Sequence, residues 1–349
     1  FINCVSGKDP FKPSGKKICT KLSMKVKINW KQRDQKFYDL TKLQFHSQNN
    51  DPSQMRERLG YWLFRSMGVP APRSVHAQLK INGTYFGLYA LTEQIDGNFA
   101  RHNFDESNGN LYKEVWPITQ KGEPQDSKVL LKGLKTNKKN NPNLELIKRF
   151  GDLIATSDSI ESRKIFSDFM HLNEMISYAV VDRAIRNDDG VLHWYTDRKE
   201  SSNHNYYWYE EPNKKKIHLI PWDLDSAFEN LTATNPITYI PDRWGEVSND
   251  CKPYPYGDWK IYQRSASCDK IIKVWNSYKD EYKELQNKLR VSYVDEANNL
   301  IDEWSLQIEE ATLEASRAHD DALTIKKWKR NVGIMKAQIF RMKMSLSDQ

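Results

Sequence analysis

The sequence predicts an α+β protein in which a sheet-rich part, residues 1–116, precedes a mostly helical part, residues 117–349. In the first part, apolar and polar residues alternate over several short runs, which is the pattern of half-buried strands. In the second part, apolar residues recur at helical spacing over most of the length. Runs of strands followed by runs of helices are typical of the α+β class.

The first strands and the first helix are predicted from this alternation and from stop signals. Residues 21–30 alternate apolar and polar side chains, as a half-buried strand does, and residues 37–47 form a second strand. A helix opens with Ser53 as its N-cap and ends at Gly68, since two prolines follow closely and prevent its continuation.

A hairpin and a short strand complete the first part. Residues 74–96 hold two alternating runs that flank Asn82-Gly83, the dipeptide that favours a two-residue hairpin turn. Residues 108–116 then form a turn and a third short strand, which carries Lys113.

The second part begins with a polar, lysine-rich connection. The elements expected here are the connection at 117–142, helices at 143–156, 160–169 and 171–186, a strand hairpin at 205–220 and a helical region at 275–345. The helix at 171–186 is apolar around much of its surface, so we expect it to be central.

Composition and charge narrow the classes of function. The sequence has 53 basic and 46 acidic residues, and its net charge of +7 is too mild to predict a nucleic-acid partner. An acidic partner protein or a polyanionic ligand fits as well. No apolar run approaches the roughly 18 residues that span a bilayer, so we expect no membrane span.

Four cysteines fall into two local pairs, Cys4 with Cys19 and Cys251 with Cys268. Two disulfides in an exported protein and four buried thiols in a cytosolic one are both consistent with this spacing. Neither CxxC nor His-x-x-x-His occurs, which argues against a zinc site.

The expected location is extracytoplasmic, in a secreted or surface-associated protein. Asn82-Gly-Thr and Asn230-Leu-Thr match the N-glycosylation pattern, although a hairpin turn explains Asn82 better. The sequence begins at Phe1 rather than Met, and we expect that any signal peptide has been removed.

Two aspartates follow an apolar strand in the segment IHLIPWDLDSAF. Carboxylates such as Asp223 and Asp225 are costly at the end of a buried strand unless they are paired or hold a cation. The alternative is an ordinary turn, in which aspartate is common.

Two further acidic residues and an amide are expected to reach the same place. Asp188 and Asp189 leave the end of the central helix, and Asn205 enters the hairpin at the end where Asp223 leaves it. Magnesium takes oxygen ligands and keeps several waters, so one or two carboxylates, an amide and a phosphate suffice. A separate carboxylate that accepts a hydroxyl proton completes the arrangement found in protein kinases. The alternatives are a helix-ending turn for the aspartates and an ordinary strand entry for Asn205.

A kinase also needs a lysine that neutralises the nucleotide phosphates and an acidic residue that positions this lysine. Lys113 and Glu93, both in the sheet-rich part, are available for this pair, and the order along the chain is kinase-like. The alternative for Lys113 is a solvated lysine on the surface of a strand.

The segments MRERLGYWLFRSMGVPAPR, INGTYFGLYALTEQID, GNLYK, NDDG, HNYYWY and IPWDLDSAF occur in this order. Together they resemble the CotH family, the spore-coat protein H-like kinases, over nearly the whole chain. The resemblance implies an atypical protein kinase with a much-reduced, kinase-like two-lobe fold. It implies ATP, Mg²⁺ or Mn²⁺ as cofactors and Ser or Thr hydroxyls of proteins, including the chain itself, as acceptors.

The resemblance also implies roles for individual positions. Asp189 is the implied catalytic base, because Asn187 to Gly190 matches the family pattern of Asn, any residue, Asp and a small residue; Asp188 is the second candidate. The other implied roles are metal binding for Asn205 and Asp223 with support from Asp225, phosphate binding for Lys113 with Glu93 as its partner, adenine stacking for Trp222, and phosphate contact for Arg56. For Trp222, packing in the core is the alternative.

One departure from the family pattern concerns spacing. Family members place the asparagine about five residues after the catalytic aspartate, whereas Asp189 and Asn205 are sixteen positions apart. The intervening VLHWYTDRKESS is thermodynamically cheap as a surface insertion. The alternatives are that it displaces the base or that it forms a lip that binds substrate through His193, Trp194 and Tyr195.

Three classes of function remain. The leading hypothesis is a kinase that transfers the γ-phosphoryl group of ATP to protein hydroxyls. The second is a non-catalytic surface adhesin or coat-assembly protein on the same fold, although such a protein has no need for the Asp/Asn/Asp set. The third is a metal-dependent hydrolase, which leaves Lys113 and Glu93 unexplained.

Overall fold

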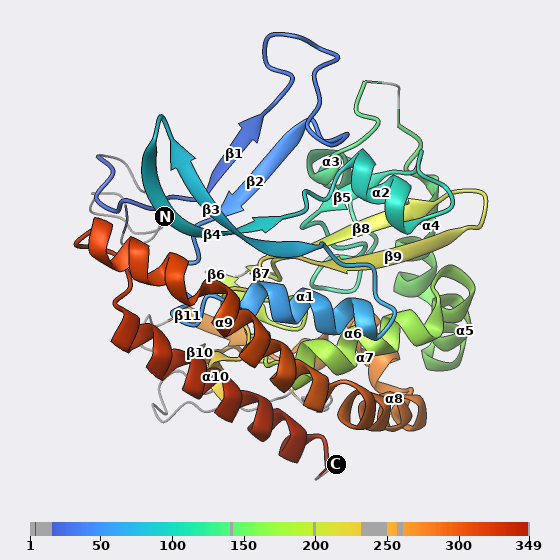
Figure 1. Cartoon of the computed structure of the whole chain (residues 1–349). Helices are drawn as coiled ribbons and strands as arrows, with labels where there is room; N and C mark the ends of the chain where they lie inside the picture. The colour runs from blue at the N-terminus through green and yellow to red at the C-terminus, as the bar shows by residue number, and fades with distance from the viewer. Residues whose placement is uncertain are drawn as a thin grey trace.

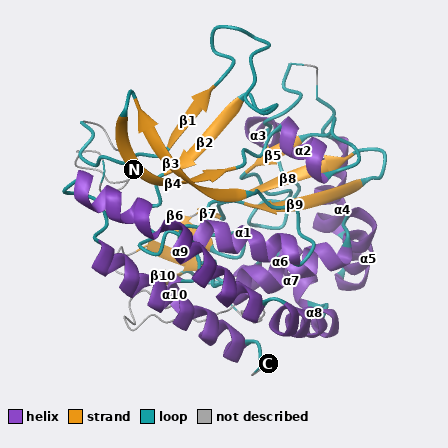
Figure 2. Ribbon diagram, in the orientation of Figure 1, coloured by secondary structure: helices purple, strands orange, loops and turns teal. Residues whose placement is uncertain are grey.

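The structure is a computed structural model that describes Cys4 and residues 16–139, 142–197, 200–231, 250–256 and 261–347. It contains both sheets and helices (Figures 1 and 2), which confirms the α+β class. The strands are β1 (Met24–Lys27), β2 (Lys42–His46), β3 (Ser74–Ile81), β4 (Thr84–Thr92), β5 (Leu111–Lys113), β6 (Trp194–Asp197), β7 (Glu200–Ser202), β8 (Tyr206–Glu211), β9 (Lys216–Pro221), β10 (Tyr254–Tyr256) and β11 (Ile261–Arg264). The α-helices are α1 (Arg56–Ser66), α2 (Gly97–Asn103), α3 (Ser127–Gly133), α4 (Glu145–Thr156), α5 (Ser159–Phe169), α6 (Leu172–Ala184), α7 (Lys270–Asn276), α8 (Lys279–Ser292), α9 (Val294–Ala318) and α10 (Ile325–Ser345).

The described strands form three antiparallel sheets. Their strand orders are β1-β2-β4-β3, β10-β11-β6-β7 and β5-β8-β9. Strand β5, which carries Lys113, therefore pairs with β8 and not with the first sheet. The kinase-like division into lobes at residues 1–116 and 117–349 remains a prediction.

The strongest local prediction, the hairpin at 74–96, is confirmed. Strands β3 and β4 are joined by Asn82 and Gly83, whose φ angles of 51° and 80° are both positive, as the two-residue turn requires. The helices expected after residue 142 and the hairpin of β8 and β9 are also present within a few residues.

Two predictions about the first strand and the first helix are wrong. Ser53 is not the N-cap of α1, because Asp51 accepts hydrogen bonds from the backbone nitrogens of Ser53 and Arg56 and so forms the turn before the helix. Strand β1 covers only four residues, and Val26 on it is exposed because this strand lies at the edge of its sheet.

Two helices were not expected. Helix α2 follows Asp96, whose side chain accepts from Asn98 N, and α3 lies inside the polar connection at 117–142. Both are only seven residues long, too short for an apolar periodicity to be visible in the sequence.

Helix α6 is central, as its apolar surface predicts. It contacts α1, α7, α8 and β9, and from Met175 to Ala184 every residue is buried. Figure 1 shows the long helices α9 and α10 side by side below the first sheet, and α9 packs against β4. Because α6 packs against β9, the end of α6 and one end of the β8–β9 hairpin are neighbours.

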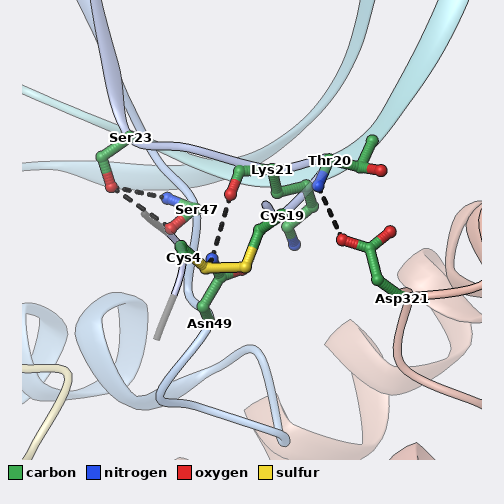
Figure 3. The surroundings of a disulfide bond; sticks show 8 residues. All are labelled: Cys4, Cys19, Thr20, Lys21, Ser23, Ser47, Asn49 and Asp321. Atoms are coloured by element: carbon green, nitrogen blue, oxygen red, sulfur yellow. Dashed lines mark hydrogen bonds between the residues drawn. A yellow bond between two sulfur atoms is a disulfide. The ribbon is translucent and has the colours of Figure 1, made fainter. Parts of the chain in front are cut away.

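Both local cysteine pairs form disulfides, which confirms the disulfide alternative. Cys4–Cys19 lies beside the connection between α9 and α10, where Thr20 N donates to Asp321 Oδ2 at 2.6 Å (Figure 3). Cys251–Cys268 joins the segment before β10 to the 3₁₀ turn after β11, at one edge of the second sheet.

Candidate functional site

The loop after α6 and the start of β8 meet through two hydrogen bonds. Asn205 donates through Nδ2 to the backbone oxygen and to Oδ2 of Asp189, both at 2.9 Å. The return strand reaches the same place, because Trp222 N donates to Asn205 O at 3.1 Å and Asp223 follows directly. The structure therefore brings Asp189, Asn205 and Asp223 together.

Four half-buried or buried carboxylates, those of Glu57, Asp189, Asp223 and Asp225, make up an acidic cluster. Burial, with repulsion from Asp225 and Glu57, raises the pKa of Asp223 to about 8. Burial and repulsion from Glu57 raise the pKa of Asp225 to about 6. Because burial and like charge both disfavour the ionised forms, a cation held in the cluster would be stabilising.

One imidazole, that of His46, lies against the acidic cluster. His46 Nδ1 lies 2.8 Å from both carboxylate oxygens of Glu57. Burial lowers the pKa of His46, but Glu57 and the more distant Asp223 and Asp225 outweigh this effect and the net pKa shift is upward. The His46 imidazole therefore faces the acidic cluster from β2, and the carboxylates favour its protonated form.

The backbone at the cluster adopts an uncommon conformation. Asn205 and Asp223 have φ angles of 59° and 53°, in the left-handed region that non-glycine residues rarely enter. Tyr61, on α1, holds Asp223 by accepting a hydrogen bond from its backbone nitrogen at 3.0 Å. Such conformations cost free energy and are concentrated at functional sites.

Asp188 and Asp189 have different surroundings. Asp188 points into the protein, where Oδ1 lies 2.7 Å from His193 Nε2 and the Asn230 side chain donates to Oδ2. Burial raises the pKa of Asp188, but His193 and the other partners lower it further, so the net shift is downward. The groups around Asp188 therefore favour its ionised form. Asn230, the first residue of the second glycosylation triplet, is buried in this contact.

The segment between Asp189 and Asn205 folds back onto Asp189. It forms strands β6 and β7, and Tyr195 on β6 donates through its hydroxyl to Asp189 Oδ1 at 2.9 Å. Burial raises the pKa of Asp189, while the hydrogen bonds from Tyr195 and Asn205 lower it, and the net shift is upward. The insertion therefore places a phenol on the candidate base rather than displacing the base.

Lys113 lies near Asn205, but with a different acidic partner from the one predicted. Its Nζ is 3.4 Å from Glu114 Oε1, and the same oxygen accepts from Asn205 N at 3.3 Å. Glu93 instead forms a bidentate ion pair with Arg73, at 2.7 and 3.1 Å. The predicted Lys113–Glu93 pair is not formed, because β5 has joined the sheet of β8 while Glu93 follows β4.

Two other predicted ligand contacts are occupied by protein groups. Trp222 is buried in a hydrophobic cluster with Tyr207 and Ile220, which favours the core-packing alternative over adenine stacking. Arg56 is buried as well, and its Nη1 donates to Asp225 O at 2.9 Å, so it lies at the acidic cluster but is held by the protein.

The donor set of the acidic cluster fits a hard divalent cation. Asp223 and Asp225 supply carboxylate oxygens, and Asn205 supplies its Oδ1, since Asp189 already uses its Nδ2. Within the described residues these carboxylates do not form a group of three whose ligand atoms all lie within 4.8 Å. Mg²⁺ keeps several waters and binds through one or two carboxylates together with substrate phosphate, so it does not require such a group.

A groove of about 920 Å³ adjoins the acidic cluster. Asn50 and Arg56 line it, and Asn50 Nδ2 donates to Asp225 Oδ2 at 3.1 Å. Lys21 lines it from the segment after Cys19, and burial lowers the pKa of this lysine to about 8. The groove has both the size and the mixed charge to bind a polar ligand.

A model of the family described as CotH kinase protein matches residues 11–343. The chain belongs to the CotH family. It is also similar to the inner spore coat protein H of Bacillus subtilis (strain 168), with 23% identity over 196 residues that cover 55% of this chain and 51% of that protein. The chain thus spans about half the length of this curated relative.

Sequence reasoning missed several residues of this CotH site. Glu57, His46, Tyr61 and Glu114 all contact it. Glu57 and Tyr61 lie within the family-like segment MRERLGYWLFRSMGVPAPR, whereas His46 and Glu114 lie outside the segments that resemble the family. For Glu57 and Tyr61 the available signal was their four-residue spacing, which places both on one face of α1. Among the described residues of this CotH chain, no helix is long and apolar enough to cross a bilayer.

Proposed function

We propose that this CotH protein is a metal-dependent protein kinase that transfers the γ-phosphoryl group of ATP to Ser or Thr hydroxyls. The observation that carries this proposal is the contact of Asp189 with Asn205 beside the buried carboxylates of Asp223 and Asp225. The carboxylates fall into two kinds. Asp189 accepts hydrogen bonds from neutral donors, as a base would, whereas Asp223 and Asp225 repel one another and would be stabilised by a cation.

In the proposed reaction, the acceptor oxygen attacks the γ-phosphorus and the bond to the β,γ-bridging oxygen breaks, which releases ADP. Asp189 takes the acceptor proton, and its raised pKa suits this role. Asn205 and Asp223 would hold Mg²⁺ or Mn²⁺, which neutralises phosphate charge, with Asp225 in support. Lys113, held by Glu114, is the group we assign to the nucleotide phosphates.

The decisive experiment measures transfer of labelled γ-phosphate from ATP to the protein itself and to a generic protein acceptor, with Mg²⁺ or Mn²⁺. We expect transfer by the wild type and its loss in both Asp189→Asn and Asp223→Asn. Asp269→Asn is the matched control, because Asp269 is also a buried aspartate with a pKa raised to about 6 but caps α7 instead. Metal-dependent ATP binding without any transfer would overturn the kinase proposal.

The name of the relative suggests where such a protein acts. The Bacillus protein is named an inner spore coat protein, so we propose that this chain also works at a surface or coat outside the cytoplasm, in agreement with its two disulfides.

The same name favours a second candidate function, coat or surface assembly without catalysis. Release of free phosphate without any protein acceptor would instead favour a hydrolase.

A further inference from the structure

Three side chains that commonly bind transition metals meet at the far end of the β8–β9 hairpin. His218 lies on β9, Glu211 ends β8, and His171 precedes α6. One ligand atom of each lies within 4.8 Å of those of the other two. The active-site residues Asn205 and Asp223 flank the opposite end of the same hairpin, so the two sites are separate.

The contact of His218 with two carboxylates requires a positive species. His218 Nδ1 is 3.0 Å from Glu174 Oε1, and Nε2 is 3.0 Å from Glu211 Oε2. When Nδ1–H donates to Glu174, Nε2 presents a lone pair to the lone pairs of Glu211. This second contact is repulsive unless a proton or a metal ion lies between the two atoms.

We propose that a metal ion, Zn²⁺ by its ligand chemistry, binds between His218 Nε2, Glu211 Oε2 and a ring nitrogen of His171, with water as the fourth ligand. His171 distinguishes this metal site from a protonated bridge. A bridging proton has no use for a second imidazole, yet the His171 ring lies 5.3 Å from that of His218. Two imidazoles and a carboxylate are a zinc donor set.

One of the three ligand separations is already close to that of a zinc site. Zinc bonds of about 2.0–2.1 Å in a tetrahedron separate the ligand atoms by roughly 3.3–3.4 Å, close to the 3.0 Å between His218 and Glu211. Lys214 Nζ lies 3.3 Å from Oε1 of Glu211, which leaves Oε2 for the metal. Glu174 then serves as the outer carboxylate that fixes the tautomer of a ligating histidine.

Such a zinc ion would join the start of α6 to the hairpin of β8 and β9. The other end of α6 leads to Asp189, and the other end of the hairpin carries Asn205 and Asp223. The metal would therefore hold the two elements whose ends form the acidic cluster. This inference stands independently of the kinase proposal, since it concerns other residues.

The test titrates Zn²⁺ into the metal-stripped full chain against a chromophoric chelator, in an Asp223→Asn background that weakens binding at the acidic cluster. We expect one zinc ion per chain and a rise in Tm on binding. His171→Ala should lower zinc affinity by about tenfold or more and reduce the rise in Tm at the same zinc concentration. His171 is exposed, so this variant keeps the buried packing. The control is His102→Ala, in which another exposed histidine is removed.

Co²⁺ provides a second readout. Bound in place of zinc, it should give the intense visible absorption of a tetrahedral site, and His171→Ala should remove that absorption. Zinc affinity that is unchanged in His171→Ala, or no zinc binding at all, would overturn the proposal and leave His218 as a protonated bridge between Glu174 and Glu211.

Discussion

Asn205 donates its side-chain amide to both the backbone oxygen and Oδ2 of Asp189, at 2.9 Å each. These two bonds orient the carboxylate after α6 from the first residues of β8. They also fix the amide itself, so that Oδ1 of Asn205 is the atom left to bind a cation. The candidate base and the candidate metal ligand therefore position each other.

Tyr195→Phe should shift the pH dependence of phosphate transfer. The Tyr195 hydroxyl stabilises the ionised form of Asp189, so its loss raises the pKa of Asp189 further. Because a general base must be deprotonated, the acidic limb of the kcat/KM profile should move to higher pH, by about one unit for one lost hydrogen bond.

The control for this prediction is Tyr262→Phe, since Tyr262 lies on the neighbouring strand β11 of the same sheet but is half-exposed. Identical profiles for wild type and Tyr195→Phe would contradict a role for Tyr195 in positioning the base.

Asp223→Asn should stabilise the metal-free protein at high pH. The pKa of Asp223 is raised from 3.8 to about 8 in the folded state, so the folded state binds this proton more tightly than the unfolded state. The stability due to this group is fully present below about pH 4 and is lost as pH rises through about 8. Replacing the carboxylate removes this loss, which is on the order of a few kcal/mol.

Thermal unfolding in chelator between pH 4 and pH 9 checks this prediction, with the exposed Asp280→Asn as control. The Tm of Asp223→Asn should exceed that of wild type most at high pH, and only wild type should gain stability from Mg²⁺ with ATP. A variant that is less stable than wild type above about pH 8 would argue against the repulsive cluster.

Glu114→Gln and Glu93→Gln should differ in their effect on ATP. Glu114 holds both Lys113 and the backbone of Asn205, so its loss should weaken ATP binding by roughly tenfold, or about 1.4 kcal/mol. Glu93 pairs with the exposed Arg73, and its loss should leave ATP affinity unchanged. Equal effects in an ATP titration would mean that Glu93 reaches Lys113 when nucleotide is bound.

Removing Cys251–Cys268 should affect stability and activity together. The disulfide closes a loop of 17 residues, and its loss in a double Ser variant should cost about 3 kcal/mol in denaturant unfolding. The disulfide flanks strands β10 and β11, and β11 pairs with β6, which carries Tyr195. The pH profile of phosphate transfer should therefore also shift as in Tyr195→Phe. A double Ser variant of Cys4–Cys19, with a loop of similar length, is the control. An unchanged profile in the first variant would separate the disulfide from the base.

Much of the fold could be predicted because its signals are local. The hairpin at Asn82-Gly83 and central helix α6 follow from turn chemistry and apolar spacing, which act between near neighbours. Helix α2 and the strand pair β6–β7 could not be predicted in the same way, because short elements are stabilised by the surfaces that they pack against.

The candidate site likewise contains residues that the sequence predicts and contacts that it does not. The sequence by itself determined that Asn205 and Asp223 lie together, since both flank the same end of one hairpin, and the family pattern in NDDG pointed to Asp189 at the end of the preceding helix. Only the tertiary structure decided the partners: Glu114 rather than Glu93 for Lys113, Tyr195 on Asp189, and His171 beside His218. These contacts join different sheets and helices, and distances between such elements depend on packing that spacing along the chain does not encode.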